Sequence, residues 1–269
     1  QDYWLQINAQ DPHYLTAGNF PVSQWILPLF DGLTVAQVVA VERTAWWLHI
    51  TGILLFLNYL YYSKHLHIIL AFPNTWFAKL APQGQFTNMQ AVPDEVKLML
   101  DPNADPYAAP ASDVAPSTFG AADVADLNWV QLMNAYSCTE CGRCTAECPA
   151  SQTGKKLSPR KIMMDTRDRL TEIGAALNKG EQPNANTLLD NYISREELWA
   201  CKSCNACVEA CPIAIDPLSI ITDMRRYLVM EQSAAPTELN NMMSNVENNG
   251  APWPFNQQDR IAWREEINI

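Results

Sequence analysis

The longest apolar stretch of the chain runs from Thr44 to Tyr62, where 19 residues contain no charged side chain. At 1.5 Å per residue, a helix of this length matches the roughly 30 Å hydrocarbon core of a membrane. Aromatic side chains mark both ends of the stretch, as at membrane interfaces, namely Trp46, Trp47, Tyr59, Tyr61 and Tyr62. We therefore predict one transmembrane helix over residues 33–72. The alternative is a buried core helix of a soluble protein.

The flanks of this helix predict its orientation. Residues 1–32 show no sustained period, and we expect an extracytoplasmic or interfacial loop there; a soluble loop packed on its own domain fits about as well. The cationic residues Lys64 and Lys79 follow the span. By the positive-inside rule the remainder of the chain lies on the cytoplasmic side of the inner membrane.

Helical patterns dominate the second half of the chain. Residues 73–128 predict an extended linker, because proline recurs there with little apolar periodicity. Start signals then predict several helices, near Asp126, at Ser158-Pro159, at the capping box Ser194-x-x-Glu197 and at Pro217. Residues 236–269, with Trp253 and Trp263, predict a partner-docking tail; local packing is the alternative. The predicted fold class is mainly α.

All eight cysteines of the chain lie in two copies of one string, with an offset of 63 residues. The first copy is Cys138-x2-Cys141-x2-Cys144-x3-Cys148-Pro149, and the second is Cys201-x2-Cys204-x2-Cys207-x3-Cys211-Pro212. This is the bacterial-type run for two [4Fe-4S] clusters, in which the fourth cysteine ligates the cluster of the other string. It predicts one-electron chemistry within residues 129–235.

The spacing assigns the ligands of each cluster. Cluster 1 takes Cys138, Cys141, Cys144 and Cys211, and cluster 2 takes Cys201, Cys204, Cys207 and Cys148. Backbone N–H groups of Gly142, Arg143 and Asn205 are expected to bond the sulfurs. Zinc sites and disulfides fit the crowding and the predicted compartment poorly. Because the predicted helices fill the segment between the strings, we expect an all-α dicluster ferredoxin domain.

The net charge of the chain excludes one class of binding partner. The chain has 18 basic and 29 acidic residues, a formal net charge of -11, and this argues against nucleic acid. It starts at Gln1, so we expect either a processed protein or part of a longer polypeptide. No residue is a convincing acid, base or nucleophile, and we expect no substrate catalysis on this chain.

Two histidines of the predicted span are candidate ligands of haem b. His49 and His67 are 18 residues apart, which on one continuous helix places them on one face about 27 Å apart. Ionisable residues within membranes are functional candidates, and each histidine would share a haem with a helix outside this sequence. Interfacial histidines are the alternative, which suits His65 better than His67.

These residues resemble known families. His49 with the segment from Ser63 to Asn74 resembles the last span of the cytochrome b (gamma) subunit of respiratory nitrate reductases, where two histidines matching His49 and His67 bind haem. The cysteine strings resemble the iron–sulfur (C-type) subunit of heterodisulfide reductase and the membrane-bound iron–sulfur oxidoreductases that fuse it to a cytochrome b part. The resemblance covers about residues 44–80 and 129–265. Neither the earlier spans of the cytochrome part nor the paired Cys-Cys-Gly domains are in this sequence.

The resemblance implies an electron-transfer subunit of a membrane oxidoreductase. Electrons would pass between a cytoplasmic partner with Cys-Cys-Gly domains or a flavin and, through both clusters, haem b and a membrane quinone. The alternative is a haem-free, membrane-anchored ferredoxin-like adaptor that docks soluble redox enzymes. The iron–sulfur subunit of a succinate or fumarate enzyme would need further cysteines for a [2Fe-2S] domain, and the chain has none to spare.

Overall fold

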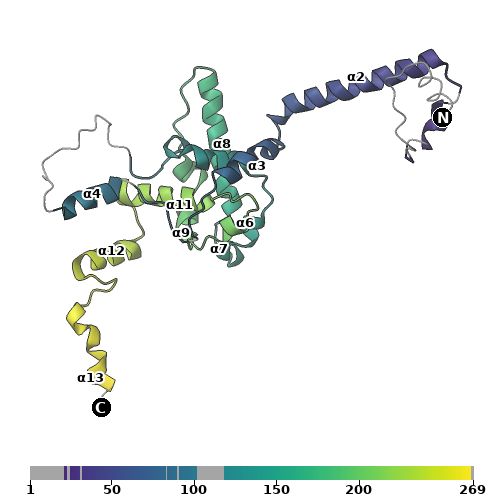
Figure 1. Ribbon diagram of the computed structural model, residues 1–269. Helices are drawn as coiled ribbons and strands as arrows, with labels where there is room; N and C mark the ends of the chain where they lie inside the picture. The colour runs from purple at the N-terminus through teal and green to yellow at the C-terminus, as the bar shows by residue number, and fades with distance from the viewer. Residues whose placement is uncertain are drawn as a thin grey trace. The chain divides into compact units, whose positions relative to one another are not determined.

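The computed structural model describes residues 21–22, 25–30, 32–82, 84–89, 91–101 and 118–267. Most of the loop predicted over residues 1–32 and the proline-rich centre of the predicted linker lie outside these residues. The chain divides into two units, residues 1–65 and 66–269. In the first unit a 3-10 turn, η2 (Leu27–Phe30), is followed by the helix α2 (Val35–Leu60) (Figure 1).

Helix α2 is apolar around its circumference. Its N-terminus is closed by a capping box in which the backbone N–H of Thr34 donates to the Gln37 side chain at 2.9 Å. Large apolar residues from Trp46 to Tyr59 are exposed, and Leu60 is the buried residue of the helix. By length and composition, α2 is the one helix of the described residues that could cross a membrane. A helix that is apolar on every side needs an apolar environment or a partner.

The continuous helix expected over residues 33–72 is interrupted, and this expectation was wrong. Residues 61–65 form a turn, and the next helix, α3 (Leu66–Trp76), starts after it. Ser63 stabilises the turn from both sides: its hydroxyl donates to the Leu60 carbonyl at 3.0 Å and accepts from the His65 N–H at 3.2 Å. His49 and His67 therefore lie on different helices, and the separation deduced from one helix does not apply.

The second unit contains the remaining helices, and its described residues include no β-strand. Before the first cysteine string come α3, α4 (Ala91–Leu100), η3 (Val124–Asp126) and α5 (Trp129–Ser137). Between the first cysteine and the second string come α6 (Arg143–Ala146), α7 (Pro149–Gln152), α8 (Pro159–Asn178), η4 (Leu188–Tyr192) and α9 (Arg195–Ala200). Then follow α10 (Ala206–Glu209), α11 (Pro217–Arg226), η5 (Tyr227–Glu231), α12 (Thr237–Asn249), η6 (Gln257–Ile261) and α13 (Trp263–Ile267).

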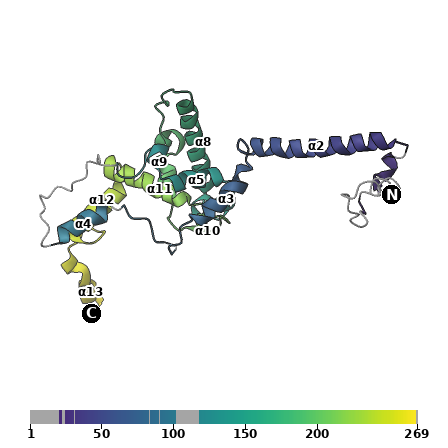
Figure 2. The same ribbon diagram turned by 45° about the horizontal axis from the view of Figure 1, so that its top comes forward.

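Equivalent helices flank the two cysteine strings. In each, a helix leads into the first cysteine, a four-residue helix carries the third, and a longer helix follows; these are α5, α6 and α8 in the first half, and α9, α10 and α11 in the second. The halves meet where α6 contacts α10 and where α8 contacts α11. Figure 2 shows α8 beside α11. This all-α frame agrees with the predicted fold of the cysteine domain.

A hydrophobic core holds the two halves together. Helices α8, α9 and α11 contribute the fully buried side chains Ile162, Met163, Leu198, Ile220 and Met224 to it. The capping box at Ser194 and Glu197 and the caps of α8 by Ser158 and α11 by Asp216 are present. The predicted cap at Asp126 was wrong: Asn128 caps α5, because its side chain accepts the Gln131 N–H at 3.0 Å.

Helix α3 packs against this domain, although it was expected to continue the membrane span. It contacts α5, and Asn74, which is 2% exposed, donates to the carbonyl of Ile213 at 2.8 Å. Farther along, Phe77 lies edge-on to Trp129 at 4.7 Å between ring centroids, and Arg226 donates to the Thr87 carbonyl. The start of the predicted linker thus contacts the domain.

Candidate metal centres

Each string begins where a helix ends. Cys138 is the C-cap of α5 and Cys201 the C-cap of α9. Two residues later the backbone turns left-handed, with φ of 60° at Glu140 and 55° at Ser203. It does so again at Gly142, with φ of 82°, and at Asn205, with φ of 61°. The two strings therefore fold alike, as their common spacing requires.

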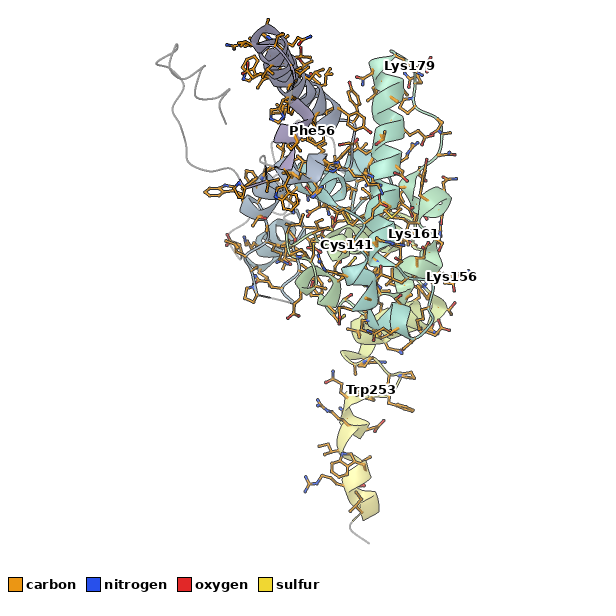
Figure 3. All side chains as sticks on the ribbon, turned by 90° about the vertical axis from the view of Figure 1, so that its right-hand side faces the viewer. Phe56, Cys141, Lys156, Lys161, Lys179 and Trp253 are labelled. Atoms are coloured by element: carbon orange, nitrogen blue, oxygen red, sulfur yellow. The ribbon has the colours of Figure 1, made fainter. Side chains whose placement is uncertain are left out.

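The folded chain gathers the cysteines around two cavities. One cavity is lined by Cys138, Cys141, Cys144 and Cys211, together with Cys207. The other is lined by Cys148, Cys201, Cys204 and Cys207. In each cavity the fourth cysteine of one string lies with the first three of the other. Figure 3 labels Cys141, which is exposed, whereas Cys148 and Cys207 are buried.

The cysteine thiols that line the two cavities are suited to binding iron–sulfur clusters. All eight cysteines are free thiols, and each cavity brings four or more of them together. In the described part of the chain, no three metal-binding side chains converge on a single ion. A cubane does not need such convergence, because its four thiolates bind different iron atoms.

The protonation of the thiols reflects their burial. Burial raises the pKa of Cys138, Cys144 and Cys201, and burial beside Cys201 and Asp216 raises the pKa of Cys207 to about 12. Iron binds the thiolate, so cluster binding must displace these protons. Without the metal, the cavities favour neutral thiols.

Backbone donors at the sulfurs come from positions that the cysteine spacing did not indicate. The N–H of Ser203 donates to Cys201 Sγ at 3.4 Å, and the N–H of Glu140 bonds Cys138 in the same way. Gly142 and Asn205, which were expected as donors, are the N-caps of α6 and α10. Arg143 approaches with its side chain, 3.9 Å from Cys141 Sγ to Nη1.

Each string has one arginine from a following helix close to its first cysteine. Arg167 of α8 pairs with Glu140 at 2.6 Å and counteracts the effect of burial on the pKa of Cys138. Arg225 of α11 donates to the carbonyls of Leu198 and Cys201, both at 2.6 Å, and to Ser203 Oγ at 3.1 Å. Its guanidinium also lies 5.1 Å from the Trp199 ring centroid. Sequence spacing gave no sign of these two arginines.

The candidate haem ligands lie in different surroundings. His49 is an exposed residue of the apolar helix α2, and the His65 ring lies 5.8 Å from that of Phe56. His67 of α3 lines the cavity that contains Cys138, Cys141 and Cys144, with Ala71 one turn farther along. The structure thus places His67 beside a cysteine cavity.

Comparisons with known proteins agree with this site. Residues 137–215 match the model of the 4Fe-4S dicluster domain. The chain is 30% identical to the probable iron-sulfur-binding oxidoreductase FadF of Bacillus subtilis and 29% identical to EtfAB:quinone oxidoreductase of Syntrophomonas wolfei, in each case over 91% of its length. A probable membrane-anchored ferredoxin of Chromohalobacter salexigens is 30% identical over 58% of the chain.

Shorter matches to two kinds of heterodisulfide reductase subunit, C and D, support the resemblance of the cysteine strings. The chain spans 36% of FadF, 34% of the quinone oxidoreductase and 26% of the membrane-anchored ferredoxin. Residues 137–215 are therefore a 4Fe-4S dicluster domain, in a chain homologous to iron–sulfur oxidoreductases.

Proposed function

We propose that this chain transfers electrons between a cytoplasmic redox partner and the membrane through two [4Fe-4S] clusters. The observation that carries the proposal is the pair of cavities, each lined by three cysteines of one string and the fourth of the other. Each bound cluster supplies one-electron chemistry. The protein holds the two sites in one core, since Cys148 belongs to the hydrophobic cluster that joins the halves.

The ligands are proposed as the spacing assigned them. Cys138, Cys141, Cys144 and Cys211 hold cluster 1, and Cys201, Cys204, Cys207 and Cys148 hold cluster 2. Cys207 lines both cavities, and its place as the third cysteine of its string favours cluster 2. Crossed ligation links the halves, so the loss of one cysteine affects the opposite half of the domain.

On the electron-transfer path, cluster 1 is the cluster that exchanges electrons with the membrane. Helix α3 follows the apolar helix α2 after the turn at residues 61–65, and α3 contributes His67 and Ala71 to the cavity of cluster 1. Helix α2 serves as a membrane anchor, in keeping with its length, its exposed apolar side chains and the membrane-anchored ferredoxin relative. The domain then lies on the cytoplasmic side, as the cations Lys64 and Lys79 favour.

The partner at the other end is a flavoprotein or a subunit with Cys-Cys-Gly domains. Relatives named as an EtfAB:quinone oxidoreductase and as heterodisulfide reductase subunits support a further redox subunit as partner. The docking surface is the tail formed by α12, η6 and α13. Helix α12 has no buried residue, and the tail exposes Trp253, which Figure 3 labels, together with Phe255 and Trp263. Exposed aromatic residues are typical anchors of protein interfaces.

The quinone-linked form of the proposal adds haem b. His49 lies in the apolar helix and His67 at the cavity of cluster 1. Each would hold a haem b together with a histidine from outside this sequence. The purified membrane complex should then show a haem b absorption band that a quinol reduces. A complex that retains both clusters but has no haem band would contradict the haem part and leave the cluster part intact.

A haem-free adaptor is the second candidate. The interruption at residues 61–65 favours it, because His67 belongs to a helix packed on the cysteine domain rather than to the apolar helix. This candidate predicts cluster signals without a haem band, and electron exchange with soluble redox enzymes that persists when α2 is removed. Loss of that exchange on removing α2 would favour the quinone-linked form.

A further inference from the structure

The two halves of the domain differ in charge at one matched position. The 63-residue offset places Glu140 of the first string opposite Ser203 of the second. Both residues have a left-handed backbone, and both direct their N–H to the first cysteine of their own string. Glu140 and Ser203 are the matched pair whose side chains contact a partly buried arginine. The turns also differ in charge where Lys202 matches Thr139 and Arg143 matches Ala206, but these two cations are exposed.

In each half this side chain contacts the arginine behind the string. Glu140 forms an ion pair with Arg167, with 2.6 Å between Oε1 and Nη2, and offsets its charge; the exposed Asp168 lies farther away, at 3.7 Å from Nε. Ser203 offers Arg225 only a hydroxyl, at 3.1 Å from Nη1. Arg225 forms no ion pair with any carboxylate in the described ranges, because its other donors bond the carbonyls of Leu198 and Cys201.

A charge at this place affects the reduction potential of a cluster. Reduction adds one negative charge, and cluster potentials depend on nearby charge, on hydrogen bonds to sulfur and on solvent exposure. Arg225 is partly buried, so solvent screens its charge less than that of an exposed cation. Arg143 of the first string, with Nη1 3.9 Å from Cys141 Sγ, and Lys202 of the second are exposed, so solvent screens their charges, and neither residue is changed in the variants compared below.

We propose that position 140/203 sets the potentials of the two clusters differently: Ser203 leaves the charge of Arg225 to favour the reduced form of cluster 2, whereas Glu140 cancels the charge of Arg167 at cluster 1. Asp216, beside Cys207, opposes Arg225 at cluster 2. Its contribution is the same in every variant compared below, so substitutions at positions 140 and 203 isolate the effect. This inference deepens the proposed function and rests on it.

Exchange of the two side chains tests the proposal in the full-length protein with its clusters bound. In Glu140→Ser, the potential of one cluster should rise; in Ser203→Glu, the potential of the other should fall. Each shift should correspond to at least a tenfold change in the equilibrium constant of reduction, which is about 59 mV for one electron. A glutamate fits at position 203 because Glu140 already adopts the same left-handed backbone at φ of 60°.

The readout is a redox titration followed by electron paramagnetic resonance, with iron and sulfide content as the check on assembly. Glu196→Ser is the matched control, because it removes an exposed carboxylate that pairs with Lys156 and lines neither cavity; it should leave both potentials unchanged. If neither exchange variant shifts a potential, or if each variant shifts both clusters equally, this inference is wrong and the proposed function is unaffected. A wild-type protein that binds no cluster overturns the proposed function as well.

Discussion

The amide of Asn74 donates a hydrogen bond of 2.8 Å to the carbonyl of Ile213, two residues after Cys211. Asn74 is 2% exposed, and it joins α3 to the loop that supplies the fourth ligand proposed for cluster 1. The same helix contributes His67 to the cavity of that cluster. This bond therefore couples the segment after the apolar helix to the cysteine domain.

Replacing Asn74 with alanine should loosen α3. The change removes the donor to Ile213 and leaves a small void, so we expect α3 docking to weaken by about 1–3 kcal/mol. Hydrogen exchange of the α3 amides should accelerate, while that of α8 should not. Thr75→Ala, at an exposed neighbouring position, is the control and should leave exchange unchanged. Equal exchange of α3 in Asn74→Ala and wild type would contradict this role.

The buried Arg169 should be the most sensitive charged residue of the domain. Its side chain is 2% exposed, and it bonds Asp123 at 2.8 Å, Glu172 at 3.0 Å and Asn184 at 2.5 Å. Arg169→Met would leave Asp123 without its cationic partner, and we expect the free energy of unfolding to fall by about 3–5 kcal/mol. Denaturant unfolding of the cluster-loaded protein measures this loss.

The exposed pair Lys156 and Glu196 provides the comparison for Arg169. The two side chains are 2.9 Å apart, but 73% and 65% of their surfaces are exposed. Lys156→Met should change the free energy of unfolding by no more than about 1 kcal/mol, because water screens the pair. A loss as large as that of Arg169→Met would show that burial does not distinguish the two sites.

Because of crossed ligation, replacing Cys148 or Cys211 should affect the cluster of the other string. Cys148→Ala should cost the cluster held by Cys201, Cys204 and Cys207, although Cys148 belongs to the first string. About half of the iron should remain. The remaining cluster should respond to Glu140→Ser and not to Ser203→Glu. The opposite response would show that each string holds its own cluster.

Sequence spacing predicted the parts of the site that depend on local chemistry. The cysteine pattern and the capping box at Ser194 and Glu197 are of this kind, and the structure contains both arrangements. The helix expected through residues 61–65 is interrupted because Ser63 stabilises a local turn there and because α3, beyond the turn, packs on α5. An apolar run does not reveal which part of it a later domain will cover.

The positions of the two arginines near the first cysteines also could not be predicted from the sequence. Arg167 and Arg225 lie 29 and 24 residues after the cysteines they approach, and only the packing of α8 and α11 places them there. One signal was available: alignment of the two strings at their 63-residue offset sets Glu140 against Ser203. A charged residue opposite a neutral one in a repeated motif marks a difference between the two sites.

The central claim is that one chain holds two [4Fe-4S] clusters in the two cysteine cavities. The most direct test measures iron and acid-labile sulfide per chain, together with the electron paramagnetic resonance spectrum of the fully reduced protein. We expect about eight iron and eight sulfide per chain, from two clusters of four each, and a spectrum broadened by two neighbouring paramagnetic clusters. Half that content with the spectrum of a single isolated cluster, or zinc in place of iron, would contradict it.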